Sequence, residues 1–175
     1  MGAAALRRAT LDDLDAIDRL ESSTFTEDAW SRSTMRSELA SKHTYYLVAV
    51  DPDTPDELAG YAGLLAPKGS GDADIQTIAV APFARRHGLG RMLMLALMAE
   101  ALARGASYVF LEVRADNPNA RTLYESLGFE QIAVRANYYQ PAGVDAHIMR
   151  FALPPDQAPI VPPPAADPPE TGMTS

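Results

Sequence analysis

The pattern of apolar and polar positions in the first half of the chain predicts two helices set among short strands. The leucine and isoleucine side chains at positions 11, 14, 17 and 20 recur at helical spacing after Thr10, which begins a near capping box. Short apolar runs separated by turns rich in proline, aspartate and glycine indicate strands. The expected elements are a strand at 5–9, a helix beginning at Thr10, a helix at 31–40, and strands at 44–50, 57–66 and 73–80.

The second half of the chain predicts a change of topology. A strand ending at Val80 is followed by a glycine turn, a helix from about Leu89 to Arg104, and a strand at 107–113. Two strands joined by a helix in this way form a βαβ unit, and its strands are parallel. The remaining elements are a helix capped by Asn117 and closed at Gly128, and strands at 129–139 and 146–153.

Together these elements predict an α/β fold with a mixed central sheet. The sheet is antiparallel at its N- and C-terminal ends and contains the parallel βαβ unit in the middle. Residues 154–175 are rich in proline, carry acidic residues and contain no basic or aromatic residue, which predicts a disordered tail. One folded domain is therefore expected over residues 1–153.

Charge and composition exclude several classes of function. A net charge of -8 argues against direct nucleic-acid binding through a broad basic face. No apolar stretch is long enough to span a membrane, and the start of the chain lacks the features of a signal peptide, so a cytoplasmic protein is expected. The absence of cysteine excludes a cysteine-linked covalent intermediate, and the three histidines have no metal-ligand spacing, so no metal is expected.

Positive charge is nevertheless concentrated in one short segment, "RRHGLG", where Arg85, Arg86 and Arg91 surround two glycines at the start of a helix. A helix N-terminus offers unpaired N–H groups to an anion, and arginine adds fork-shaped donors. The segment lacks the Gly-Lys-Ser/Thr of ATP-binding loops, and Leu93 stands where a dinucleotide fingerprint needs its third glycine. A tight turn with solvated arginines is the alternative, but the agreement of strand, turn, helix and arginines favours an anion site.

This segment resembles the Arg/Gln-x-x-Gly-x-Gly/Ala pyrophosphate loop of the GNAT acyltransferase superfamily, whose ligand is acetyl-CoA. Three segments, "IAVAPFARRHGLGRML", "LEVRADNPNARTLYESLGF" and "RANYYQPAGVDAHIM", together resemble the RimI-type ribosomal-protein alanine N-acetyltransferases. The resemblance runs from about Leu6 to Ala152 and implies a GNAT fold with helices on both faces of the sheet. The cofactor-binding residues that it implies are Ile78, Ala79, Val80, Arg85, Arg86, His87, Gly88, Leu89, Gly90, Arg91 and Asn117.

Two residues are candidates for acid–base catalysis. Glu112 interrupts an apolar strand that is expected to be buried, where a carboxylate needs a partner or access to water. Pairing with Arg114 is the structural alternative, whereas the resemblance places the general base of the family on Glu112. Tyr124 lies on an apolar helix face, which favours a core tyrosine, whereas the resemblance places the general acid there. The backbone N–H of Val80 is the candidate oxyanion donor.

The acceptor side is less sharply defined. Trp30 lies in a segment that resembles the Pro-Trp-Ser segment of the family, although Ala29 and Met35 depart from the usual proline and phenylalanine. Tyr138 and Tyr139 are candidates to line an acceptor groove, with packing in a strand as the alternative.

The function that the resemblance implies is acetylation of the N-terminal alanine of a basic small-subunit ribosomal protein, by direct attack in a ternary complex. Acetylation of lysine side chains or small amines, and a non-catalytic CoA-sensing module, remain open. An RNA-binding patch at 85–91 is disfavoured by its small size and acidic surroundings. The oligomeric state is left open.

Overall fold

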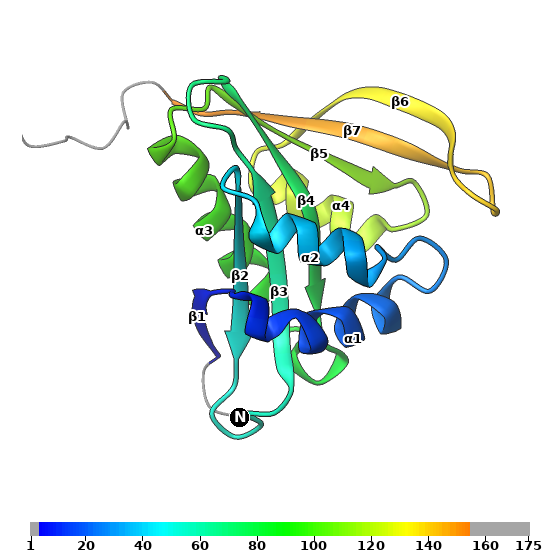
Figure 1. Cartoon of the computed structure of the whole chain (residues 1–175). Helices are drawn as coiled ribbons and strands as arrows, with labels where there is room; N and C mark the ends of the chain where they lie inside the picture. Colours follow the sequence, from blue (N-terminus) through cyan, green and yellow to red (C-terminus); the bar gives the residue numbers. More distant parts are fainter. Residues whose placement is uncertain (1–3, 155–175) are drawn as a thin grey trace, which may run out of the picture.

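The computed structural model describes residues 4–154 of the chain (Figure 1). Apart from Pro154, the predicted tail lies outside the described residues. In chain order the elements are β1 (Ala5–Arg8), η1 (Leu11–Asp13), α1 (Leu14–Thr24), α2 (Arg32–Ala40), β2 (Thr44–Val50), β3 (Leu58–Leu65), β4 (Asp72–Val80), η2 (Pro82–Ala84), α3 (Leu89–Ala103), β5 (Tyr108–Arg114), α4 (Pro118–Ser126), β6 (Glu130–Tyr139) and β7 (Val144–Ala152).

All the described strands join one seven-stranded sheet in the order β1-β2-β3-β4-β5-β7-β6. The predicted mixed sheet is confirmed, since β4 and β5 pair in parallel and every other neighbouring pair is antiparallel. The hairpin of β6 and β7 places the last strand, β7, between β5 and β6. Helices α1 and α2 lie on one face of the sheet and α3 and α4 on the other, as expected (Figure 1).

The parallel ladder between β4 and β5 is short. It contains three residue pairs, of which the last is Asp74 with Phe110. Beyond this pair the two strands separate, and Figure 1 shows them diverging toward their carboxyl ends. Strand β5 stays paired with β7 from Tyr108 to Arg114. Beyond Phe110, β5 is therefore held by β7 alone, and the facing edge of β4 is open.

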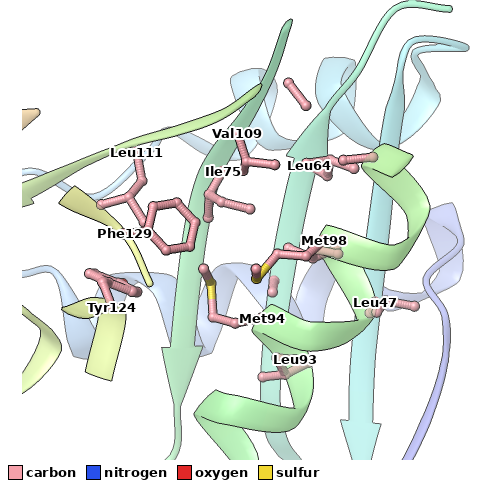
Figure 2. Packing of buried hydrophobic residues seen from close by; sticks show 14 of the residues in the cluster. Leu47, Leu64, Ile75, Leu93, Met94, Met98, Val109, Leu111, Tyr124 and Phe129 are labelled. Carbon is pink, nitrogen blue, oxygen red and sulfur yellow. The ribbon is translucent and has the colours of Figure 1, made fainter. Parts of the chain in front are cut away.

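The larger core cluster lies between the sheet and helices α3 and α4 (Figure 2). Leu93, Met94 and Leu97 of α3 have no solvent exposure and contact the apolar side chains of the central strands. Strand β3 is buried along six of its eight residues, because helices cover both of its faces. Complete burial of each large α3 side chain stabilises the fold by about 1.5–3 kcal/mol.

The local signals at the helix ends are confirmed, with one correction. Thr10 and Asp13 form a capping box, and the Asn117 side chain accepts a hydrogen bond from the N–H of Ala120 at 3.2 Å. Leu11, however, is 47% exposed and does not share the buried face of Leu14. The first helical segment begins with a turn of 3-10 helix at Leu11. The α-helix itself therefore starts one turn later than predicted, at Leu14.

Candidate active site

The predicted anion loop forms the start of α3. Gly88 is the N-cap of this helix with φ of 75°, a left-handed conformation that glycine adopts without steric cost. The first helical hydrogen bond runs from the N–H of Met92 to the carbonyl of Gly88, so the amides of residues 89–91 have no acceptor within the helix. They face a groove of about 1080 Å³. The predicted residues that line this groove are Ile78, Ala79, Val80, Arg85, Arg86, Gly88, Leu89, Gly90, Arg91 and Asn117.

The arginines of this loop have no carboxylate partner in the part of the chain that the structure describes. Among residues 4–154, neither Arg85, Arg86 nor Arg91 forms an ion pair. The Nε of Arg85 instead donates to the carbonyl of Val80 at 3.2 Å. Unpaired arginines beside free amides at a helix N-terminus fit the charge of a pyrophosphate. His87 is exposed and is not among the residues that line the groove.

Gly90 has a packing role in the first turn of α3. A Cβ atom at this position would lie 3.3 Å from Leu123 on α4 and 3.9 Å from Val80 on β4. The absence of a side chain therefore lets the start of α3 approach both elements closely, which narrows the groove around the free amides.

The open edge of β4 offers backbone groups to the same groove. The N–H of Ala81 donates to Ala59 on the β3 side of the strand. Because successive residues of a strand direct their backbone groups to opposite sides, Val80 and Ile78 face the side from which β5 has separated. Ala79 instead turns its backbone toward β3, in register with Tyr61. Of the three predicted strand residues, Ile78 and Val80 can therefore pair with an extended ligand through their backbone, whereas Ala79 cannot.

A second cavity of about 730 Å³ lies in the gap between β4 and β5 and continues the groove. Phe25, Asp28, Ile78, Asn117 and other residues line both. The cavity brings together the two acid–base candidates and the three acceptor candidates of the sequence analysis. These are Glu112, Tyr124, Trp30, Tyr138 and Tyr139.

Glu112 lines this cavity on its solvent-accessible side. The expectation that it is buried within a parallel sheet is wrong, because the parallel ladder ends at Phe110 and the Glu112 side chain remains 32% exposed. Its carboxylate pairs with Arg135 of β6 at 3.2 Å. The predicted alternative partner, Arg114, pairs with Asp116 instead. The carboxylate is thus accessible from the cavity, and within residues 4–154 its ion pair with Arg135 is the one that it forms.

Tyr124 is the core tyrosine that its helix face predicted, and its role as general acid stays a prediction. The residue is 6% exposed, and its ring centre lies 6.2 Å from that of Phe129. Figure 2 shows both residues in the core cluster, while Tyr124 also lines the cavity. Burial raises the pKa of Tyr124 to about 12, since the phenolate would be poorly solvated there. At neutral pH the hydroxyl therefore keeps its proton and is able to donate it.

Aromatic residues form the acceptor side of the cavity. The rings of Tyr138 and Tyr139 meet edge to face with 5.1 Å between their centres, and Arg114 lies 5.0 Å from the Tyr139 ring centre. A hydrogen bond to Glu112 raises the pKa of Tyr138, and burial is the main reason that the pKa of Tyr139 rises to about 12. Trp30 faces them from the segment between α1 and α2.

The sequence alone did not point to one buried carboxylate of the cavity wall, that of Glu21. This residue of α1 is 1% exposed, and burial raises its pKa to about 7. Its oxygens accept hydrogen bonds from the N–H of Trp30 at 3.2 Å and from the hydroxyl of Thr77 at 3.3 Å. The sequence pattern that could have identified it is the helical spacing, since Glu21 follows Leu14 and Ile17 on the buried face of α1.

The fold and the site together define a class of protein. The acetyltransferase (GNAT) family matches residues 14–129, and the chain belongs to this family. It is an acetyl-CoA-dependent N-acetyltransferase by class.

Within the family, the chain is similar to RimI enzymes. It is 38% identical to the N-alpha-acetyltransferase RimI of Mycobacterium tuberculosis over 83% of this chain and 89% of that protein. An uncharacterised protein of Mycobacterium leprae is 40% identical over 79% of this chain, but the match spans only 38% of the longer relative. The crystal structure of the ribosomal-protein-S18-alanine N-acetyltransferase from Escherichia coli has a TM-score of 0.74 and 30% identity, and the match covers 85% of this chain and 93% of that one.

Two negative observations concern the described residues alone. Among residues 4–154, no cluster of three or more His, Asp or Glu side chains is placed to hold a metal ion. Within the same range, no helix combines the length and the apolar composition needed to cross a membrane. Metal-free chemistry therefore stays a prediction.

Proposed function

We propose that this protein acetylates the N-terminal α-amine of a small-subunit ribosomal protein that begins with alanine. The observation that carries the proposal is the placement of Glu112 and Tyr124 on one cavity that continues into the arginine-lined groove at the start of α3. The groove holds the pyrophosphate of acetyl-CoA, and the open edge of β4 pairs with its extended arm. The thioester then lies in the gap between the strands.

The two candidate residues divide the proton transfers of the reaction. Glu112 removes a proton from the acceptor ammonium, and the amine nitrogen forms a bond to the acetyl carbonyl carbon. The carbon–sulfur bond breaks, and the Tyr124 hydroxyl gives its proton to the departing sulfur. The nitrogen loses its second proton as the amide forms, and this proton restores the Tyr124 hydroxyl. The N–H of Val80, which points into the gap, stabilises the charge on the acetyl oxygen. Direct attack suits a chain that has no cysteine to carry an acyl group.

The charges of the cavity support a cationic acceptor. Glu21, Asp28, Asp74 and Glu112 line it, and its two arginines, Arg114 and Arg135, already pair with carboxylates. Burial and the neighbouring charges of Asp72 and Glu112 raise the pKa of Asp74, which shows that negative charge is crowded here. An ammonium group relieves this repulsion. Such an acceptor also fits the cytoplasm, where ribosomal proteins are made.

The choice of an N-terminal alanine rests on the relatives. The Escherichia coli structure is named for alanine acetylation of ribosomal protein S18, and the Mycobacterium tuberculosis relative is named for α-amines. Lysine side chains and small amines are the alternative acceptors, because the cofactor groove is common to all of them. A CoA-sensing module is the alternative without turnover.

Competition between acceptors tests the proposal. Peptides beginning Ala-Arg and N-blocked peptides containing lysine are incubated with the protein and acetyl-CoA, and the products are read by mass spectrometry. We expect acetylation of the free α-amine of the Ala-Arg peptide alone. Exclusive modification of lysine would transfer the assignment to a side-chain acetyltransferase, and no modification of any amine would favour the sensing module.

A further inference from the structure

Glu21 is a buried carboxylate that the proposed chemistry does not use, and it connects three parts of the site. It belongs to α1, it accepts the N–H of Trp30 in the segment between α1 and α2, and it accepts the hydroxyl of Thr77 on β4. Trp30 lines the acceptor side of the cavity, and Thr77 precedes Ile78 on the open edge of β4. One side chain thus links the acceptor wall to the strand along which the cofactor arm is expected to lie.

The bond to Glu21 is one of the contacts that hold the segment carrying Trp30, beside the ion pair of Asp28 with Arg114 at 3.5 Å. Residues 25–31 have no helix or strand of their own, and their ends are fixed by bonds of Phe25 to α1 and of Ser31 to α2. Between these ends, the hydrogen bond to Glu21 holds the backbone of Trp30 against α1. The hydrogen bonds of Glu21 also connect to β3, since the hydroxyl of Thr77 lies 3.2 Å from that of Tyr61 on β3.

We propose that Glu21 is a positioning residue, whose two carboxylate oxygens fix Trp30 relative to β4 and so set the width of the acceptor side of the cavity. The inference rests on the proposed function to the extent that it takes the acceptor to enter past Trp30. Glu21 does not need to touch the acceptor, because it acts through the backbone of Trp30.

The charged surroundings of Glu21 are consistent with a role in geometry rather than in charge pairing. The groups that face it are Asp18 on α1 and Asp28 in the segment, both negative, and Tyr46 on β2, which is neutral. Glu38 of α2 adds a further negative charge near Tyr46. Within residues 4–154 no arginine or lysine forms an ion pair with Glu21.

A neutral side chain of the same shape can keep both contacts. In glutamine, the carbonyl oxygen accepts from Trp30 and the amide group donates to Thr77, whose own hydroxyl then turns to Tyr61. Leucine has similar bulk but offers neither contact, which leaves the half-buried N–H of Trp30 without its acceptor and the Thr77 hydroxyl with Tyr61 alone. Both variants lack the negative charge, but only glutamine keeps the two hydrogen bonds. Comparing them therefore distinguishes the effect of the hydrogen bonds from the effect of the charge.

Steady-state kinetics with the Ala-Arg peptide give the first test. For Glu21→Leu we expect the KM for the peptide to rise about tenfold, because a buried hydrogen-bonding group is left unpaired, while the KM for acetyl-CoA is unchanged. Glu21→Gln should restore the peptide KM. Thr77→Val, which removes one of the two contacts, should shift the peptide KM in the same direction and serves if the leucine variant does not fold. Asp51→Asn is the matched control, since Asp51 is 3% exposed and lies in the turn after β2.

The fluorescence of Trp30 gives a second test that needs no turnover. Trp30 is the only tryptophan in the chain, so its emission and its quenching by acrylamide report on this segment alone. We expect Glu21→Leu to change both and Glu21→Gln and Asp51→Asn to change neither. This result would support the inference even if no peptide were acetylated, an outcome that counts against the proposed function only.

Three results would overturn the inference. They are an unchanged peptide KM and unchanged Trp30 emission in folded Glu21→Leu, an equal loss in Glu21→Gln and Glu21→Leu, or a parallel rise in the KM for acetyl-CoA. The first removes the link to Trp30, the second assigns the role to charge, and the third indicates a general disturbance of the fold.

Discussion

At the scale of single residues, the site depends on where each carboxylate lies relative to the separation of β4 and β5. Glu112 comes two residues after the last rung of the parallel ladder, and this position makes it accessible from the cavity. Glu21 lies under the acceptor wall with almost no exposure. The two carboxylates therefore differ in surroundings, and substitution of each should give a different result.

Replacement of the exposed carboxylate should abolish turnover and spare binding. For Glu112→Gln we expect kcat to fall about 100- to 10,000-fold, the usual range for loss of a general base. The affinity for acetyl-CoA should stay as in the parent, since the groove residues are untouched, and calorimetry measures it. A variant that keeps its rate would remove Glu112 from the proposed mechanism.

Replacement of the buried carboxylate should alter the pH dependence of stability. The pKa of Glu21 is raised from its ordinary 4.5 to about 7, so the folded protein binds more protons than the unfolded chain between these values. Its contribution is therefore most favourable below pH 4.5 and is lost as the pH rises through 7. Relative to the parent, Glu21→Gln should gain about 2 kcal/mol in the free energy of unfolding from pH 5 to pH 8, an amount set by the difference between the folded and unfolded pKa of Glu21. Urea titrations at the two pH values measure this, and a constant difference would contradict it.

At the scale of elements, the N-terminus of α3 concentrates the groups that suit an anion. Arg85 and Arg91 lie on either side of Gly88, and the free amides lie between them. The strand before this loop and the helix after it were predictable, because a buried strand, a glycine turn and an apolar helix each leave a clear local pattern. The three-residue length of the parallel ladder was not predictable, since it depends on packing between elements that are distant in the sequence.

Removal of the loop arginines should weaken cofactor binding. We expect Arg85→Met and Arg91→Met each to reduce the affinity for acetyl-CoA about tenfold, since each removes a charge-assisted hydrogen bond to phosphate. The loss should shrink as salt is added, because exposed charges are screened. Arg36→Met, an exposed change on α2, is the control. Equal affinities across all three variants would place the pyrophosphate elsewhere.

At the scale of the whole molecule, the two apolar clusters hold the sheet between its helix layers. The fold class, the order of elements along the chain and five residues that line the cavity followed from the sequence and its resemblance. The burial of Glu112 was mispredicted because a strand pattern does not reveal where a neighbour departs. Glu21 was overlooked because one acidic residue among apolar helix positions reads as the polar edge of the helix.

Close packing across the sheet gives a prediction on stability. A Cβ atom at Gly63 would lie 2.3 Å from the ring of Tyr46, which crosses β3 to bond Gln76 at 2.6 Å. Gly63→Ala should therefore lower the free energy of unfolding by about 1–3 kcal/mol, because the ring has to move within a filled core. Thermal denaturation measures the change. An unchanged melting temperature would indicate that the ring shifts at no cost.

The shortness of the ladder between β4 and β5 has a consequence for how the protein responds to stress. Three residue pairs join strands β1–β4 to strands β5–β7, the fewest between any two neighbouring strands of the described sheet. The core cluster beside α3 and α4 contains side chains from both groups of strands. We expect smaller residues in that cluster to let the two groups of strands separate at this ladder before the longer ladders open. The gap that the reactants are proposed to enter would then also be the place where the sheet opens first.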